Sequence, residues 1–214
     1  MADSSLTLHA GKISRSGQHL DPALWRWEVG SAVPQGGTPV TPREALGQIS
    51  GGTQLRHLVI GVIGPRDATP AHMQAAETIG RALGGLGITV ICGGKSGVME
   101  AVSKGCRAAG GLVIGILPGH EPDDANPYIA IPLPTGLSEG RNMVIAKSAR
   151  VLIAVGGSHG TLSEVAYGLH FGRPVIGVEG AAVVEGVVQA ASAEQAIDLA
   201  CAALLDAAKP AEKE

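Results

Sequence analysis

The sequence predicts an α/β fold in which helices cover both faces of a doubly wound, mostly parallel sheet. Short segments that are apolar throughout alternate with helical segments of about 10–15 residues, a pattern typical of parallel strands buried on both faces. Glycine accounts for 32 of the 214 residues and aromatic residues for only 2%. The core must therefore be aliphatic and closely packed, with loops whose backbone can approach a ligand. A hydrophobic fraction of 45% and a charged fraction of 16% exclude a disordered chain.

The first strand of this sheet is expected at 57–63, where His-Leu-Val-Ile-Gly-Val-Ile is nearly all apolar, and a helix follows at 70–84. The same alternation continues along the chain. Further strands are expected at 88–92, 112–117, 128–131, 150–155 and 174–178, and further helices at 97–109, 139–148, 160–171 and 193–207. Residues 118–127 are rich in Pro, Asp and Glu and are expected to form an irregular loop. In such sheets ligands bind beyond the carboxyl ends of the strands, where helix N-termini point.

Residues 1–55 differ from the remainder and are expected to be an N-terminal extension of a ligand-binding domain at 56–214. The extension contains both tryptophans. The alternation of Trp25, Trp27 and Val29 predicts a short strand with one apolar face.

A helix is expected to begin within the extension at Thr41. Thr41 is its N-cap, Pro42 takes the first helical position and Glu44 completes a capping box. The run Ser50-Gly51-Gly52 is expected to end this helix and to act as a joint.

Composition excludes several classes of function. The net charge is −3 and the isoelectric point is about 6.2, and there is no basic block, so nucleic acid is not an expected partner. The apolar runs are too short to span a membrane, and the start of the chain lacks the pattern of a signal peptide. Three scattered cysteines without a C-x-x-C pair indicate reduced thiols and a cytoplasmic protein. The seven histidines show no metal-ligand spacing, so no metal site is expected.

Glycine-rich loops follow two of the predicted strands. Gly64 ends the strand at 57–63 and either lets the backbone approach a ligand or forms a plain turn. The second loop runs from Cys92 to Glu100, and its glycines can aim several backbone N–H groups at an anion. Lys95 can contact phosphate or can simply be solvated. The alternative for this loop is close packing between helix and strand. The residues expected to bind ligand here are Gly64, Gly93, Gly94, Lys95, Gly97 and Met99.

A third segment, 155–164, follows the strand at 150–155 and includes the start of the helix at 160–171. It predicts a second anion cradle. Its expected ligand-binding residues are Gly156, Gly157, Ser158, Gly160 and Thr161. Gly160 is expected to adopt positive φ, so that valine there would block the cradle. Glu164 lies one turn further, where its carboxylate either reaches the rim of the site or only stabilises the helix dipole.

A fourth segment, Ser138-Glu139-Gly140-Arg141-Asn142, opens the helix at 139–148. Arg141 near a helix start opposes the helix dipole, which favours a functional role over helix stabilisation. The alternative is a surface arginine.

Together these segments resemble the LONELY GUY-like superfamily of Rossmann-like proteins, formerly called lysine decarboxylase-like and related to the DprA nucleotide-binding fold. The resemblance runs from about 57 to 180. The family signature G-G-G-x-x-G-L-M corresponds to 92–99, with Cys92 in place of the first glycine. The signature P-G-G-x-G-T-x-x-E corresponds to 156–164, with Gly156 for the proline and Ser158 for the second glycine. The family arginine falls on Arg141.

Within this superfamily, the run Gly140-Arg141-Asn142 is similar to the branch of molybdenum cofactor carrier proteins; the hydrolases usually have Glu-Arg-Lys there. The resemblance implies a binding protein for a phosphorylated, nucleotide-like ligand, with Asn142 among the ligand-binding residues. The alternative is a phosphoribohydrolase that cleaves the N-glycosidic bond of purine nucleoside 5′-monophosphates, with Arg141 and Glu164 as catalytic residues. A third alternative is a structural subunit without a ligand.

The resemblance implies no required cofactor. The candidate ligands are molybdenum cofactor and a nucleoside monophosphate. It also implies a homo-oligomer, either a dimer or a tetramer. Apolar residues spread around more than one face of the helices at 70–84 and 97–109, which favours helix contacts between subunits.

Overall fold

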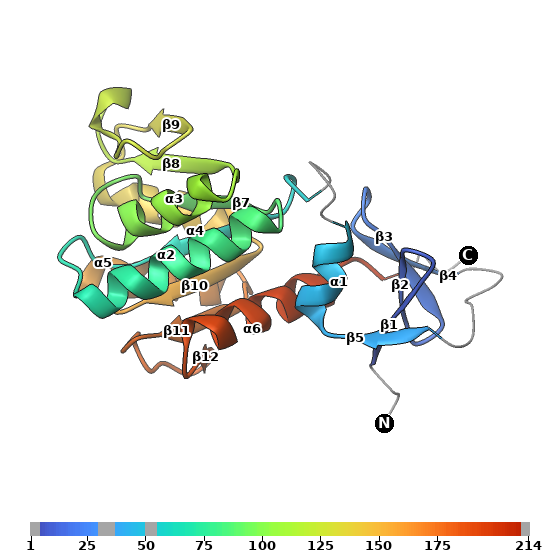
Figure 1. Cartoon of the computed structure of the whole chain (residues 1–214). Coiled ribbons are helices and arrows are strands. Elements are labelled where there is room, and N and C mark those ends of the chain that lie inside the picture. The colour runs from blue at the N-terminus through green and yellow to red at the C-terminus, as the bar shows by residue number, and fades with distance from the viewer. Residues whose placement is uncertain (1–4, 30–36, 50–54, 211–214) are drawn as a thin grey trace.

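The computed structural model describes residues 5–29, 37–49 and 55–210 (Figure 1). Its larger sheet has seven strands in the order β12-β11-β10-β6-β7-β8-β9, and every neighbouring pair is parallel. The strands are β6 (Val59–Ile63), β7 (Thr89–Cys92), β8 (Val113–Leu117), β9 (Ile131–Pro134), β10 (Val151–Val155), β11 (Val175–Val178) and β12 (Val187–Gln189). The helices that follow them are α2 (Pro70–Gly85), α3 (Val98–Ala108), α4 (Arg141–Ser148), α5 (His159–His170) and α6 (Ala193–Asp206). The fold class expected from the sequence is confirmed.

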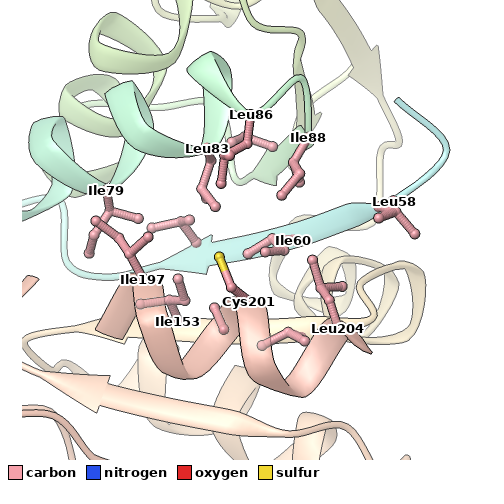
Figure 2. Packing of buried hydrophobic residues seen from close by; sticks show 14 of the residues in the cluster. Leu58, Ile60, Ile79, Leu83, Leu86, Ile88, Ile153, Ile197, Cys201 and Leu204 are labelled. Atoms are coloured by element: carbon pink, nitrogen blue, oxygen red, sulfur yellow. The ribbon is translucent and has the colours of Figure 1, made fainter. Parts of the chain in front are cut away.

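Alternate residues of the central strands point to opposite faces of the sheet. Ile60 and Val62 belong to the hydrophobic core that includes α2, α3 and α6. The next residue, Ile63, belongs to a second core with α4 and α5. Figure 2 shows side chains of α2 and α6 meeting around Ile60 of β6. Because both faces are covered, the strands are apolar throughout, and this makes them visible in the sequence.

Two edge strands differ from expectation. β9 lies at Ile131–Pro134, later in the chain than the expected strand at 128–131. It contains two prolines, which an edge strand tolerates because one side of its backbone has no partner strand. β12 was not expected. It is only three residues long and lies at the other edge of the sheet, where two of its residues are exposed.

Helices α2 and α3 pack closely against each other inside the chain. A Cβ atom at Gly80 of α2 would lie 2.1 Å from the carbonyl oxygen of Val102, and one at Gly105 of α3 would lie 2.1 Å from that of Glu77. Most of the apolar residues of these helices therefore face the sheet or each other, whereas Ala71 and Met73 of α2 and Ala108 of α3 are exposed. The oligomer, and a contact between subunits through these helices, stay predictions.

The N-terminal region forms a second, antiparallel sheet in the order β4-β3-β2-β1-β5, where one short strand had been expected. Its elements are β1 (Leu6–His9), β2 (Lys12–Arg15), β3 (Gln18–Asp21), β4 (Arg26–Val29), β5 (Thr38–Val40) and α1 (Pro42–Ile49). The expected capping box of α1 is present, because the Thr41 N–H donates to Glu44 and the Glu44 N–H donates to the Thr41 hydroxyl. The joint expected at Ser50–Gly52 lies outside the described residues.

This N-terminal sheet is attached to the end of α6, as Figure 1 shows. The indole N–H groups of Trp25 and Trp27 donate to the carbonyl oxygens of Leu204 and Leu205, at 2.9 and 3.2 Å. These carbonyls lie in the last turn of α6, beyond the reach of the regular helical hydrogen bonds, and that of Leu205 also accepts from the Ala208 N–H at 3.3 Å. Lys209 then exchanges two backbone hydrogen bonds with Trp25 and Trp27, so the C-terminal segment pairs with the edge of β4. No helix among the described residues is both long and apolar enough to cross a membrane.

Candidate functional site

A cavity of about 550 Å³ opens at the carboxyl ends of β6 and β10. In the sheet, β6 has β7 on one side and β10 on the other. The strands that follow β6 first extend the sheet in one direction and then, from β10, in the opposite direction, so the strand order reverses at this point. Ligands of doubly wound folds bind at such a reversal. The lining residues are Ile63, Gly64, Pro65, Arg66, Asp67, Gly93, Met99, Pro118, Ser138, Glu139, Arg141, Asn142, Gly157, Ser158, Gly160, Thr161 and Glu164.

The start of α5 forms one wall of the cavity. Ser158 is its N-cap, and the Ser158 hydroxyl accepts a hydrogen bond from the Thr161 N–H at 3.2 Å. The N–H groups of His159 and Gly160, in the first turn, have no acceptor within the helix. They add to the positive end of the helix dipole, and this wall suits an anion. We call the segment Gly157–Thr161 the anion cradle.

Two glycines near the cradle have different roles. Gly160 lies inside α5 and does not adopt positive φ, so the expectation of positive φ there is wrong. The nearest atom to a Cβ at Gly160 would be the Ser158 hydroxyl oxygen, at 3.7 Å, which leaves the backbone open toward the cavity. Gly156 has a φ of +62°, and its Cβ would lie 2.6 Å from the His72 ring. Gly156 therefore allows the loop to pass His72 and does not line the cavity.

Arg141 and Glu164 face each other in the cavity, and both are buried. Nη1 of Arg141 lies 3.6 Å from Oε1 of Glu164. Burial raises the pKa of Glu164 to about 8, although the Arg141 charge opposes the shift. The Glu164 carboxyl group is therefore mostly protonated at pH 7. Among the described residues, Nε of Arg141 is buried without a hydrogen-bond partner.

Asn142 connects the two helix starts. Its Oδ1 accepts from Nη1 of Arg141 at 2.6 Å, and its Nδ2 donates to the Ser163 hydroxyl at 2.9 Å. The same Nδ2 lies 3.4 Å from the carbonyl oxygen of Gly160. Asn142 thus orients the Arg141 guanidinium relative to the anion cradle.

The loop after β7 contributes Gly93 to the cavity, and the first turn of α3 contributes Met99. A Cβ at Gly93 would lie 2.8 Å from Nη2 of Arg141, so only glycine lets the backbone approach the guanidinium. Gly94 and Gly97 have φ angles of +70° and +69° and do not line the cavity. A Cβ at either would lie within 2.5 Å of neighbouring loop or strand atoms. Close packing therefore accounts for these two glycines.

Lys95 lies outside the cavity. Its Nζ donates to the carbonyl oxygen of Asp124 at 2.9 Å and lies 3.4 Å from the Asp124 carboxylate. Gly64 does line the cavity, but its Cβ would also lie 2.6 Å from Val98. Gly64 thus combines close packing with backbone exposure to the cavity.

Four polar residues of the cavity were not expected from the sequence: Arg66, Asp67, Ser138 and Glu139. Arg66 had a visible signal, because it follows Gly64-Pro65 directly beyond a strand end. The other three had none beyond their proximity to the loops. No group of three His, Cys, Asp or Glu side chains within the described ranges could hold a metal ion.

Comparisons with known proteins agree with this geometry. The molybdenum cofactor binding protein of Rippkaea orientalis superposes with a TM-score of 0.64 at 35% identity, covering 68% of this chain and 96% of that protein. The molybdenum cofactor carrier protein of Chlamydomonas reinhardtii superposes with a TM-score of 0.63 at 34% identity, covering 69% and 98%. An uncharacterized protein of Archaeoglobus fulgidus is 35% identical over 144 residues, which are 67% of this chain and 95% of the archaeal protein.

The sequence model of the SLOG cluster4 family matches residues 57–208. The match begins after the N-terminal sheet and includes every residue that lines the cavity. The resemblance inferred from the motifs, to the Rossmann-like LONELY GUY-like superfamily and its molybdenum cofactor carrier branch, is confirmed. The chain belongs to the SLOG cluster4 family.

Proposed function

We propose that this protein binds a phosphorylated, nucleotide-like small molecule in the cavity between β6 and β10. The observation that carries the proposal is the anion cradle, whose open helix start lies in the same cavity as Arg141. The likeness to the molybdenum cofactor binding and carrier proteins favours molybdenum cofactor or a nucleoside monophosphate as the ligand.

The phosphate is expected at the cradle. The N–H groups of His159 and Gly160 donate to its oxygens, and the helix dipole favours its charge. The Thr161 hydroxyl is 3.0 Å from the Ser158 hydroxyl, so either can turn a donor toward the phosphate. Arg141 supplies positive charge from the start of α4.

Glu164 supports binding of an anion because its raised pKa removes a negative charge from the cavity wall. An ionised carboxylate here would repel the phosphate, whereas a protonated carboxyl group can donate a hydrogen bond to the ligand. Burial keeps Glu164 neutral at pH 7 even though the Arg141 charge favours its ionised form.

One observation favours an enzyme as the second candidate function. Arg141 and Glu164 converge in the cavity, as a phosphoribohydrolase of this superfamily would require. In that reaction Glu164 would orient or activate groups at the ribose, and Arg141 would stabilise the departing base.

Mass spectrometry of the molecules that co-purify with the protein tests the proposal, with release of free base from AMP and GMP assayed in parallel. A stoichiometric phosphorylated ligand without base release supports a binding protein. Catalytic base release supports the hydrolase. If the protein carries no phosphorylated ligand and binds neither AMP, GMP nor molybdenum cofactor, the proposal is wrong.

A further inference from the structure

A second hollow of about 360 Å³ lies beside the cavity, between the loops that follow β6, β7 and β8. Its polar lining consists of Arg66, Lys95, Ser96, Glu100, Asp124 and Asn126. Arg66 lines both this second hollow and the main cavity. The loop after β6 therefore separates two concave regions at the same edge of the sheet.

We propose that the ligand is dinucleotide-like, with two ring-bearing halves joined by a pyrophosphate. One half lies in the main cavity with its phosphate at the anion cradle, the second phosphate of the linker lies at Arg66, and a neutral, nucleoside-like half lies in the second hollow. The inference rests on the proposed function, because it assigns the first half to the cavity already described.

Sheet topology supports a ligand of this length. In doubly wound folds a dinucleotide spans the point where the strand order reverses, with one half on each side of the first strand. Here β6 is the first strand of the large sheet, with β10 on one side and β7 on the other. Both sides are hollowed, and a mononucleotide would use only one of them.

Arg66 is positioned to neutralise the linker. Its backbone is fixed, because the Val98 N–H donates to the Pro65 carbonyl oxygen at 3.1 Å and a Cβ at Gly97 would lie 2.2 Å from the Arg66 carbonyl oxygen. Its side chain is exposed, and among the described residues its guanidinium makes no hydrogen bond or ion pair. A guanidinium can bind two phosphate oxygens at once.

The start of α2 offers few free donors to the linker, although dinucleotide folds usually place the pyrophosphate at the first helix. Thr69 and His72 form a reciprocal capping box, in which the Thr69 hydroxyl accepts from the His72 N–H at 3.2 Å. His72 Nδ1 accepts from the Thr69 N–H at 3.3 Å, and Pro70 has no N–H to offer. Of the N–H groups at this helix start, that of Ala71 alone has no acceptor in the cap among the described residues, so we assign the second phosphate to Arg66.

The second hollow suits a neutral group that carries hydrogen-bond donors. Its wall holds the carboxylates of Glu100 and Asp124, and the ammonium of Lys95 is already bound by Asp124. A further phosphate would be repelled here. Ribose hydroxyls and the amino groups of a base can donate to these carboxylates.

The experiment compares ligands that share one half. Binding of AMP is measured by titration calorimetry against diadenosine diphosphate, and GMP against diguanosine diphosphate. Molybdenum cofactor is compared with its form extended by a nucleoside monophosphate. In whichever of these pairs binds, we expect the longer ligand to bind about tenfold more tightly or better than the shorter one, because one charge-assisted hydrogen bond has about this effect.

Variants test which residues cause the higher affinity for the longer ligand. Arg66→Ala is expected to remove the advantage of the longer ligand, whereas Arg107→Ala, at an exposed arginine of α3, keeps it. Glu100→Gln is expected to reduce the advantage, with Glu185→Gln as the exposed control. Equal affinities for short and long ligands, or an advantage that survives Arg66→Ala and Glu100→Gln, would overturn the inference while the proposed function stands. Binding of neither member of any pair would overturn both.

Discussion

Replacing Glu164 with glutamine is expected to stabilise the folded protein, and to do so increasingly as the pH rises. Burial raises the pKa of Glu164 from its usual 4.5 to about 8, so the folded state holds this proton over a range in which the unfolded state releases it. Stability from this group is fully present below pH 4.5, falls between pH 4.5 and 8, and is lost above pH 8. Glutamine does not titrate and escapes this loss.

The size of the effect follows from the shift. A change from 4.5 to about 8, at 1.36 kcal/mol per unit, gives a difference on the order of 5 kcal/mol above pH 8. At pH 6 the expected difference is about 2 kcal/mol. The glutamine side chain keeps an oxygen near Arg141, and Nη1 of Arg141 still donates to Asn142, so the variant does not leave the guanidinium without a partner.

Urea unfolding measured from pH 4.5 to 9 tests this expectation, with the free energy of unfolding taken from curves of equal slope. Glu185→Gln serves as the control, because Glu185 is an exposed carboxylate that does not line the cavity. If wild type and Glu164→Gln lose stability in parallel over this range, the carboxyl group does not hold a proton in the folded state. The account of the cavity's charge would then be wrong.

Three further predictions concern other parts of the molecule. Arg141→Ala is expected to weaken binding of a phosphorylated ligand at least tenfold and to abolish any base release, and full base release by this variant in a chromatographic assay would refute its role. Trp25→Phe removes the indole donor to the Leu204 carbonyl and is expected to cost about 1–3 kcal/mol in urea unfolding, so an unchanged midpoint would show that this contact does not hold the N-terminal sheet. Light scattering is expected to show a dimer or tetramer, with the exposed Leu162 and Tyr167 of α5 at the contact between subunits. Leu162→Lys should then lower the measured mass, and a wild-type mass near 21.5 kDa, that of one chain, would contradict the expectation.

The large sheet could be predicted because its strands are buried on both faces. Each central strand is a continuous apolar run, and the helices between them fill the intervening lengths. The edge strand β12 carried no such signal, because its three residues are mostly exposed. Burial on both faces is thus what makes a strand readable from sequence.

The N-terminal sheet was missed although it carried a local signal. Ala10-Gly11 and Ser16-Gly17 are two-residue turns in which both residues have positive φ, the conformation of tight hairpins. The strands beside them are only four residues long, so alternation along each is too brief to be recognised. The turn dipeptides were the better guide to this sheet.

The cavity was predictable in outline because strand ends with glycine-rich loops meet at one edge of a parallel sheet. Ten of the residues expected to act in the site line the cavity: Gly64, Gly93, Met99, Arg141, Asn142, Gly157, Ser158, Gly160, Thr161 and Glu164. Lys95 could not be placed from the sequence, because Asp124, which binds it, lies 29 positions away. The pairing of Arg141 with Glu164 likewise depends on how α4 and α5 pack.

Titration of wild type, Gly160→Val and Gly85→Val with the phosphorylated ligand that co-purifies, or with AMP, GMP and molybdenum cofactor, tests the anion cradle most directly. A valine side chain at Gly160 would project where the backbone is open to the cavity, whereas Gly85 is an exposed glycine of α2 with nothing within 4 Å of its Cβ position. We expect at least tenfold weaker binding by Gly160→Val and wild-type binding by Gly85→Val. Wild-type affinity in Gly160→Val would contradict the claim that the start of α5 holds the phosphate.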